Sequence, residues 1–366
     1  MNPLPLSHYA KAARADLPAD AFRPVPSRLL WLALHVAIVV AGTIAIAKGV
    51  GGLWAALPIS LLIGHSFAGC AFVGHELLHG SVVRGRRARL TIGWLCFLPF
   101  TLSPRLWVAW HNEVHHGNTM RVDIDPDAYP TLAQYQASGV TRLADRFALG
   151  HRRWGGIVTL LLGFTGQSSQ MLLRFAGQRG WLDKSEHRFA IFETLLGIGV
   201  WTTVGFLVGW PGFLFAFVIP LIVANVVVMS YIVTNHSLSP LTEVNDPLLN
   251  SLSVTVPHFV EVLHLNFGYH VEHHLFPALS GRHAPAVRAA LERRWPERYQ
   301  NLPLLEALSR LAATPRVYAD EMTLIDPLDG HTAPTLRPGA PAVVPAAPEP
   351  RAAQPSAVAY PASPVS

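Results

Sequence analysis

Four long apolar stretches stand out along the chain, and each is long enough to cross a membrane. They cover residues 29–47, 53–73, 190–209 and 212–234. A helix that rises about 1.5 Å per residue needs roughly 20 apolar residues to cross a hydrocarbon core of about 30 Å. Short turn-forming segments, KGVGG and WP, join the first pair and the second pair. The pattern predicts an all-α integral membrane protein with four transmembrane helices in two hairpins.

Two further apolar runs differ from these four. Residues 90–103 form a run that is too short to span, and residues 157–173 include the polar sequence QSSQ. Such segments favour helices that lie at the membrane interface or re-enter the membrane from one side.

The distribution of basic residues predicts the orientation. Four crossings place three parts of the chain on the same side of the membrane: residues 1–28, residues 74–189 and everything after residue 234. These three parts contain every Lys and Arg except Lys48. The positive-inside rule makes that side cytoplasmic, which is the cytoplasmic face of the inner membrane if the source is a bacterium. Two basic clusters, Arg84/Arg86/Arg87/Arg89 and Arg152/Arg153, act as topology determinants or contact anionic lipid or an acidic electron donor.

Composition agrees with a membrane protein and defines the ends of the chain. Of 366 residues, 51% are hydrophobic and 14% are charged. Residues 1–28 have no apolar core, so no cleavable signal peptide is expected and the first span is a retained anchor. We expect a membrane domain at 29–300, a C-terminal extension at 301–330 and a disordered Pro/Ala-rich tail at 331–366.

The two cysteines do not suggest a metal or disulfide site. Cys70 and Cys96 stand in apolar runs and are predicted to be core residues. No motif indicates nucleotide or nucleic-acid binding.

Half of the eighteen histidines are clustered. The motifs HELLH, HNEVHH, TNHS and HVEHH contain His75, His79, His111, His115, His116, His236, His270, His273 and His274. Imidazole binds divalent iron, zinc and copper, and one such ion accepts about four to six donors. A set of nine imidazoles therefore predicts two metal ions on the cytoplasmic side.

Helical spacing predicts how the histidines are shared. At about 100° per residue, positions four apart lie on one helical face, so His75 and His79 can bind one ion, as can His111 and His115. The histidines of HVEHH also share one face. His116 lies about 140° from His111 and should point elsewhere, toward a second ion. Imidazoles with few carboxylates between them suit a redox metal better than calcium or magnesium.

A carboxylate triplet follows the second histidine cluster. Asp123, Asp125 and Asp127 in VDIDPDAYP lack the glycine and the closing glutamate of a calcium loop. We predict a structured turn near the site, shaped by Pro126.

The motif HELLHG is followed by HNEVHH in the same central segment and, after the second pair of spans, by HVEHHLFP. In this order the three motifs resemble the three histidine boxes of the membrane fatty acid desaturase family. The resemblance covers roughly residues 30–300. It implies two iron ions (Fe²⁺/Fe³⁺), O₂ as co-substrate, and insertion of a C=C bond into a fatty acyl chain carried by a lipid, coenzyme A or a carrier protein. It also implies eight ligands in the boxes, with His236 matching an extra histidine of the family. The chain has no fused cytochrome b5 motif, so a separate ferredoxin, rubredoxin or cytochrome b5-like protein is expected to supply electrons.

Several residues near the boxes are candidates for supporting roles. Those expected to contact the ligands directly or through water are Asn235, Asn266, His264, Glu76, Glu113 and Glu272. For His264 an ordinary polar role stays open, and for the three glutamates solvated charge stays open. Trp107 and Trp110 are predicted either to line the acyl path or to anchor the chain at the membrane interface.

Three alternatives remain at this stage. HELLH also satisfies the HExxH pattern of zinc metalloproteases, with Glu76 as general base and Asp329 of LDG as a third ligand. A di-iron hydroxylase or ketolase acting on an alkane, a carotenoid or another apolar lipid would use similar boxes. A metal transporter would place ligands inside the spans, where only His35 and His65 lie, and these are not paired at helical spacing with another ligand.

Overall fold

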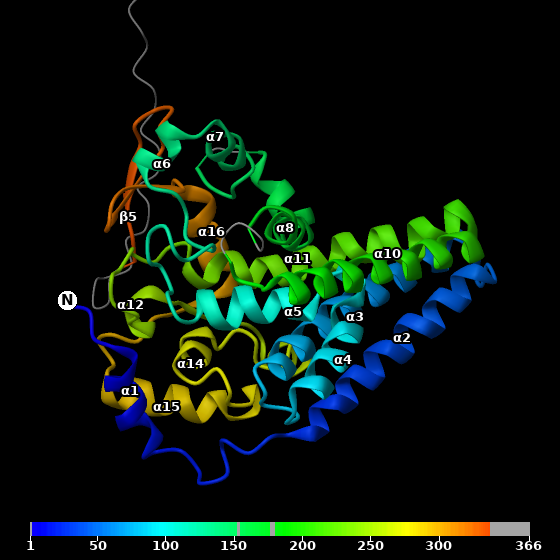
Figure 1. The fold of residues 1–366 in the computed structure, drawn as a ribbon, viewed down its shortest axis with the longest axis horizontal. Helices are drawn as coiled ribbons and strands as arrows, with labels where there is room; N and C mark the ends of the chain where they lie inside the picture. The colour runs from blue at the N-terminus through cyan, green and yellow to red at the C-terminus, as the bar shows by residue number, and fades with distance from the viewer. Residues whose placement is uncertain (1, 152–153, 176–179, 337–366) are drawn as a thin grey trace, which may run out of the picture.

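The computed structural model describes residues 2–151, 154–175 and 180–336. Four long helices form an arm that extends to the right in Figure 1. They are α2 (Leu29–Ala47), α3 (Gly52–Leu78), α10 (Lys184–Phe213) and α11 (Ile219–His236). The shorter elements gather at the other end, where the N-terminus also lies (Figure 1).

The first predicted hairpin is formed by α2 and α3. Helix α2 has the predicted bounds, and α3 begins one residue earlier than predicted. Helix α3 does not end with the apolar run at Val73 but continues to Leu78. The reason is local, because Glu and Leu favour helix and nothing in HELL interrupts the backbone hydrogen bonds. The first histidine box is therefore the last turn of a long helix rather than a segment after it.

The second predicted hairpin lies in one helical run, Lys184–His236, which folds back near Gly209 (Figure 1). Gly209 has φ 70° and ψ 169°, a combination that essentially only glycine adopts, and it breaks the helix there. The π-helix η5 (Leu214–Val218) then leads into α11. In the described part of the chain, three helical runs are long and apolar enough to cross a membrane.

The two intermediate apolar runs are helical and are bent or short. Helix α4 (Arg86–Phe97) and η2 (Leu98–Phe100) meet the following helical segment, Pro104–His115, at 100°. Helix α8 (Gly156–Gln170) continues as the π-helix η4 (Met171–Phe175). If the bent pair counted as one span, the number of candidate spans would be four.

The remaining elements are short and build the end of the molecule opposite the arm. They are α1 (Leu6–Arg14), η1 (Pro26–Arg28), α5 (Pro104–Trp107), η3 (Val108–His115), α6 (Leu132–Ala137), α7 (Gly139–Asp145), α12 (Pro247–Asn250), β1 (Ser253–Thr255), α13 (His258–Leu263), α14 (His270–Leu275), η6 (Gly281–His283), α15 (Ala284–Arg294), β2 (Asn301–Pro303), α16 (Leu304–Ala313), β3 (Val317–Asp320), β4 (Thr323–Ile325) and β5 (Thr332–Pro334). Strands β1 and β2 pair in parallel, and β3, β4 and β5 form an antiparallel sheet. The fold is thus mostly helical, and the all-α prediction is corrected by these two small sheets.

Both ends of the described chain pack against the rest. On α1, Tyr9 and Ala13 are fully buried against α14 and α15, so the N-terminal segment is part of the packed structure. At the other end, β5 lies within the predicted disordered tail and pairs with β4. The predicted boundary at residue 331 is therefore wrong, because backbone pairing orders this segment despite its Pro/Ala content. The rest of that tail, residues 337–366, and the basic pair Arg152/Arg153 lie outside the described residues.

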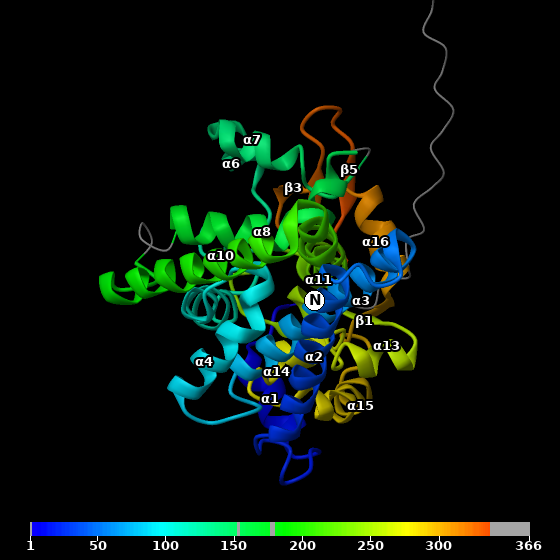
Figure 2. The ribbon, with the colours of Figure 1, turned by 90° about the vertical axis from the view of Figure 1, so that its right-hand side faces the viewer.

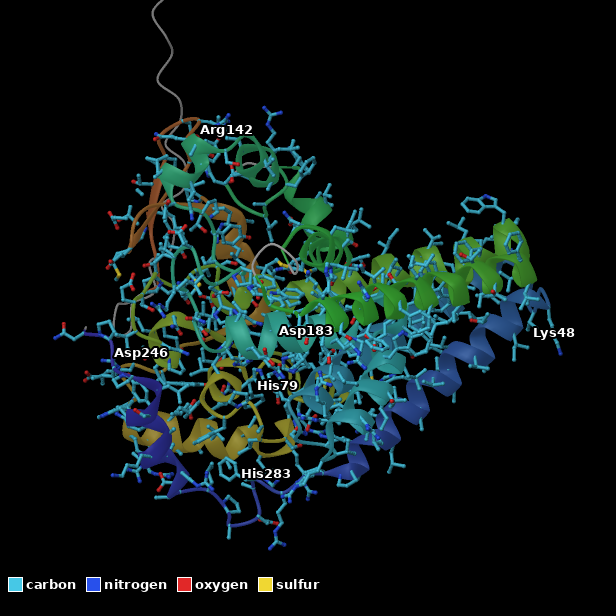
Figure 3. The ribbon with its side chains drawn as sticks, in the orientation of Figure 1. Lys48, His79, Arg142, Asp183, Asp246 and His283 are labelled. Atoms are coloured by element: carbon cyan, nitrogen blue, oxygen red, sulfur yellow. The ribbon has the colours of Figure 1, made fainter. Side chains whose placement is uncertain are left out.

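Helix α3 is the centre of the packing. It contacts both α2 and α11, and most of its second half is buried. Seen along the arm in Figure 2, α8, α10 and α4 lie to the left of α11, and α13 and α16 lie to its right. Cys70 and Cys96 are buried free thiols, as predicted. The last turn of α3 therefore delivers the first histidine box into the middle of the molecule, where Figure 3 shows His79.

Candidate metal centre

Four elements bring all nine clustered histidines together. His75 lies in the last turn of α3, His79 directly follows this helix, and His236 is the last residue of α11. The second box occupies η3 and the residue after it, and the third box occupies α14. Among the described residues, three sets of possible metal donors have their atoms within 4.8 Å of one another. These sets are His75/His79/His111/His273, His115/His236/His274 and His111/His115/Asp127. The first two sets have no histidine in common, which agrees with two ions.

The second box does not follow the predicted helical geometry. Residues 108–115 form a π-helix, and the amide of His116 donates to the carbonyl of His111 at 3.1 Å. Because residues five apart are neighbours in a π-helix, His111 and His116 face each other, with their Nε2 atoms 3.3 Å apart. The prediction that His116 points away from His111 is wrong for this reason. His115, one position earlier, faces the second set.

The remaining box histidines complete the two sets. The Nε2 atom of His116 lies 3.0 Å from that of His273, beside the first set. The Nε2 atom of His270 lies 2.8 Å from that of His236, beside the second. His116 also stacks on His274, with ring centroids 4.3 Å apart, so the two sets are adjacent. Five imidazoles thus surround one point and four surround a neighbouring one.

The donor atoms fit metal ions. The Nε2 atoms of His75, His79 and His274 are buried and have no hydrogen-bond partner among the described residues. An unpaired buried nitrogen costs about 1–3 kcal/mol, a cost that a bound cation would remove. Burial lowers the pKa of the third-box histidines His270, His273 and His274 well below the ordinary value, so these imidazoles are neutral and can donate a lone pair. The donor set suits iron, zinc or copper rather than calcium or magnesium.

Hydrogen bonds at Nδ1 orient three ligands of the second set. The Nδ1 atom of His236 lies 2.8 Å from the carbonyl oxygen of Asn250, and that of His274 lies 3.3 Å from the hydroxyl of Thr119. The Nδ1 atom of His115 lies 2.9 Å from a carboxylate oxygen of Asp125. Each contact leaves Nε2 directed toward the metal position, which is how outer hydrogen bonds select the tautomer of a metal-binding histidine.

The carboxylates inside the boxes do not play the expected supporting role. Glu76 pairs with Arg28 at 3.2 Å and accepts hydrogen bonds from Ser280 and Gly281. Glu272 is buried and accepts from Ser253 and Tyr299, with Arg288 at 3.4 Å. Glu113 is exposed. Glu76 and Glu272 thus connect the box helices to neighbouring segments, because their side chains leave the helix on the side away from the imidazoles.

The supporting carboxylates come from the turn that follows the second box. Asp125 accepts backbone hydrogen bonds from Met120 and Asp127, which confirms the predicted turn. Burial would lower the pKa of His115, but Asp125 and Asp127 outweigh it and raise this pKa to about 9. Burial raises the pKa of Asp127 to about 6, partly offset by His115. Sequence reasoning missed this role, although the position of the triplet ten residues after a ligand was an available signal.

A cavity of about 580 Å³ reaches the histidines from one side. Trp107 and Trp110 line it and are each 3% exposed, which supports the path role over interface anchoring. The ring of Trp107 stacks on His111 at 4.4 Å, and the indole nitrogen of Trp110 donates to Asp127. Most other lining side chains are apolar or small: Ala71, Phe72, Phe97, Phe147, Val158, Leu162, Gly163, Phe164, Gly166, Val228, Met229, Ile232 and Phe267.

Three further candidates differ in position. Asn235 lines this cavity beside His236, and its Oδ1 atom is buried without a partner among the described residues. The Asn266 amide donates to the carbonyl of Gly281 and helps to hold that loop. His264 bonds to Tyr231 and His65 rather than to a box histidine, so it belongs to a different cluster.

The zinc-protease alternative does not fit this geometry. His75 and His79 share their site with His111 and His273. Asp329, the residue that a protease would need as third ligand, instead lies 3.5 Å from His151. The other histidines of the centre would have no role in such an enzyme.

Comparison with known proteins agrees with the histidine arrangement. The family model described as fatty acid desaturase matches residues 52–303, which include all nine histidines. The chain belongs to the fatty acid desaturase family. The expected family and enzyme class are thereby confirmed, and the protein is an oxidoreductase that desaturates a fatty acyl chain.

Individual relatives are distant but match over most of their length. The chain is 23% identical to the sn-1 oleoyl-lipid 12-desaturase of Synechocystis sp., over 80% of this chain and 85% of the relative. It is 28% identical to the sn-1 acyl-lipid omega-3 desaturase (ferredoxin) of the same organism, over 72% and 74%. It is 22% identical to the chloroplastic omega-6 fatty acid desaturase of Arabidopsis thaliana, over 68% and 56%.

Proposed function

We propose that the nine histidines hold two iron ions and that this desaturase uses them, with O₂, to convert a CH₂–CH₂ unit of a membrane acyl lipid into CH=CH. The observation that carries the proposal is the convergence of nine imidazoles in two adjacent buried sets. In the balanced reaction, O₂ accepts two hydrogens from the acyl chain, two electrons from a donor and two protons, and leaves as two water molecules. Bound iron would supply the redox chemistry with O₂.

The protein's own residues position the chain and exclude water. Trp107 and Phe267 line the cavity next to His75, so an acyl chain in the cavity would pass beside the first histidine set. The apolar walls favour a methylene chain over water, which keeps a reactive centre away from solvent. Asn235 is proposed to complete the second set through a water molecule, since it lines the cavity beside His236 and its Oδ1 atom has no partner among the described residues.

The cavity opening favours a lipid as acyl carrier over coenzyme A or a carrier protein. Phe147, Val158 and Leu162 line the cavity and are 44%, 39% and 49% exposed, so its outer part lies among apolar side chains that face outward. An acyl chain could enter sideways from a bilayer without crossing water. The relatives named acyl-lipid desaturases support the same choice.

An external protein is proposed to supply the electrons. One relative is named a ferredoxin-dependent enzyme, which supports a ferredoxin-type donor over a rubredoxin or cytochrome b5-like protein. The formal net charge of +5 is compatible with an acidic donor of this kind.

We further propose four spans, with the metal centre on the cytoplasmic side of the membrane. Lys48 lies at the tip of the arm, far from His79 (Figure 3). Two exposed tryptophans, Trp54 (95%) and Trp210 (72%), follow the two turns of the hairpins, as expected for residues at a membrane interface. The tip of the arm, with Lys48, would then face away from the cytoplasm. Every Lys and Arg other than Lys48 would lie on the cytoplasmic side.

Two measurements test this function. The protein purified in detergent from iron-replete cells should contain close to two irons per chain, and His273→Ala should lower this content. Membranes with a deuterated saturated acyl lipid, O₂ and reduced ferredoxin should yield a product that has lost two labels from adjacent carbons. A product that gains an oxygen atom from O₂ would show a hydroxylase instead, and one zinc per chain would contradict the di-iron centre.

A further inference from the structure

A second polar cluster lies among the long helices, outside the metal centre. His65 of α3, Tyr231 of α11 and His264, the residue after α13, meet between helices that are otherwise apolar. His35 of α2 joins them, with its ring centroid 6.3 Å from that of His65. Neither His35 nor His65 is paired with another ligand at helical spacing, and it is the tertiary structure that brings His65 to His264 and His35 to His65. Ionisable residues inside a membrane region are costly, so a connected group of them indicates a function.

The cluster is a hydrogen-bonded chain that runs from a buried end at Tyr231 to a less buried end at His65. The Tyr231 hydroxyl lies 2.8 Å from Nδ1 of His264, and Nε2 of His264 lies 3.2 Å from Nε2 of His65. Tyr231 is 1% exposed and His264 is 8% exposed, whereas His65 is only partly buried. If Tyr231 donates its proton to His264, His264 can pass its own Nε2 proton to His65, nearer the surface.

Aromatic contacts link the inner end of this chain to the metal centre. Phe267 lies between Tyr231 and His75, with ring centroids 5.6 Å and 4.9 Å away. Phe72 contacts Tyr231, His264 and Phe267. Because phenylalanine rings carry no exchangeable proton, the described side chains offer no hydrogen-bonded route for protons from His65 past Tyr231. An electron can cross the gap filled by the single ring of Phe267, so the geometry suits electron exchange rather than proton supply to the centre.

We propose that Tyr231 is a redox-active residue that reduces the metal centre when the centre has been oxidised by O₂ and no acyl chain reacts. This inference rests on the proposed iron and O₂ chemistry. Tyr231 loses one electron to the oxidised centre and becomes a neutral tyrosyl radical, while its phenolic proton moves to Nδ1 of His264. The external electron donor then returns the electron, and the proton returns from His264. Tyr231 is thereby oxidised in place of the ligand His75 and of Trp107 beside it.

Electron paramagnetic resonance of the full-length, iron-loaded protein tests the role of Tyr231. Samples reduced with ferredoxin, exposed to O₂ without acyl lipid and freeze-quenched should show a tyrosyl radical, and ring-deuterated tyrosine should narrow its signal. Tyr231→Phe should abolish the signal. The matched control is Tyr318→Phe, because Tyr318 is also fully buried but its hydroxyl donates to the backbone carbonyl of Ser239, which cannot take up the proton.

Two further measurements separate protection from packing. His264→Gln keeps a hydrogen-bonding side chain but cannot accept the proton, so the radical yield should fall several-fold. Peptide mass spectrometry after repeated O₂ exposure should find several-fold more oxidation at His75 and Trp107 in Tyr231→Phe than in Tyr318→Phe. The proposal is overturned if the radical persists in Tyr231→Phe, if the wild type forms none, or if damage is equal in the two variants. A wild-type chain that forms no unsaturated product would contradict the proposed function itself.

Discussion

At the residue scale, the position of the proton on each imidazole decides which nitrogen faces the metal. His115 shows this most clearly, because Asp125 lies 2.9 Å from the Nδ1 atom of His115. The Nε2 atom of His115 is then the one that can bind a metal ion in the second set. Asp127 lies 3.5 Å from the Nδ1 atom and adds to the negative charge. A ligand that is held by carboxylates is both oriented and made a stronger donor.

Replacing Asp125 should therefore weaken the centre without removing a ligand. Asp125→Asn is expected to lower metal affinity roughly 10- to 100-fold, the usual effect of losing such an outer partner. A chelator titration followed by metal analysis would measure it. The control is Asp123→Asn, because Asp123 bonds to Gln134 rather than to a ligand. Equal affinities in the two variants would contradict the role given to Asp125.

The size of one residue in the cavity wall should control which chains fit. Gly166 lines the cavity, and a Cβ atom built there meets nothing within 4 Å. Gly166→Phe should occupy that space and reduce kcat/KM for long acyl lipids by roughly tenfold or more, about 1.4 kcal/mol, with a smaller loss for shorter chains. Product analysis with lipids of different chain length is the measurement.

Gly199 offers a matched control for this substitution. Like Gly166, it is an exposed helical glycine with open space at Cβ, but it lies on α10 and does not line the cavity. Gly199→Phe should leave the chain-length profile unchanged. If Gly166→Phe also leaves it unchanged, the cavity is not the acyl site.

At the element scale, the ligands depend on where each helix ends and how it is wound. The centre takes its histidines from the last turns of α3 and α11, from a π-helix and from the six-residue helix α14. Helix α14 is too short to be stable alone, so its partners hold it in place. Glu272 provides that support by bonding to Ser253 of β1 and Tyr299 and by pairing with Arg288 of α15.

The C-terminal strand should contribute to stability, against the expectation from composition. Strand β5 pairs with β4, and the amide of Leu336 donates to the carbonyl of Leu238 at 2.7 Å. Each such hydrogen bond contributes about 0.5–1.5 kcal/mol net. A chain ending at Gly330 should therefore melt at a lower temperature in detergent than a chain ending at Leu336, which keeps β5 and the Leu336 hydrogen bond. Equal melting of the two would show that β5 is dispensable.

At the scale of the whole molecule, an apolar arm is separated from an end that holds the metal centre and most of the charge. Figure 3 shows Lys48 at the tip of the arm, His79 near the middle of the molecule, and Asp246 and Arg142 at the end away from the tip. Exposed apolar side chains along the arm, such as Phe206 (85%) and Leu207 (78%), would be covered by lipid. The shape fits a protein that reaches acyl chains in the bilayer from one side.

The proposed orientation can be tested with reporters of sidedness. A reporter inserted after Thr141 should behave as cytoplasmic, and one inserted at Gly51 as external, because the proposed four spans would place every Lys and Arg but Lys48 on the side of the metal centre. The opposite pattern would overturn the four-span proposal, since the histidine boxes would then lie on the outer face.

The sequence by itself determined the long helices, the nine candidate ligands and the family. These depend on local patterns, namely apolar runs of spanning length and histidines at short spacings, which need no knowledge of distant contacts. The helix bounds of α2 follow directly from its apolar run. The extension of α3 beyond Val73 and the strand β5 were not predicted, because polar residues ended the apolar pattern where backbone hydrogen bonding continued.

The tertiary structure alone decided how the residues share their tasks. The π-helix turned His116 toward His111, although regular helical spacing separated them. Asp125, rather than the glutamates of the boxes, supports His115. His65 meets His264 from a position 199 residues away. The physical reason is common to all three, since a periodic pattern specifies the direction of a side chain only in regular structure, whereas its partners depend on helix winding, turns and long-range packing.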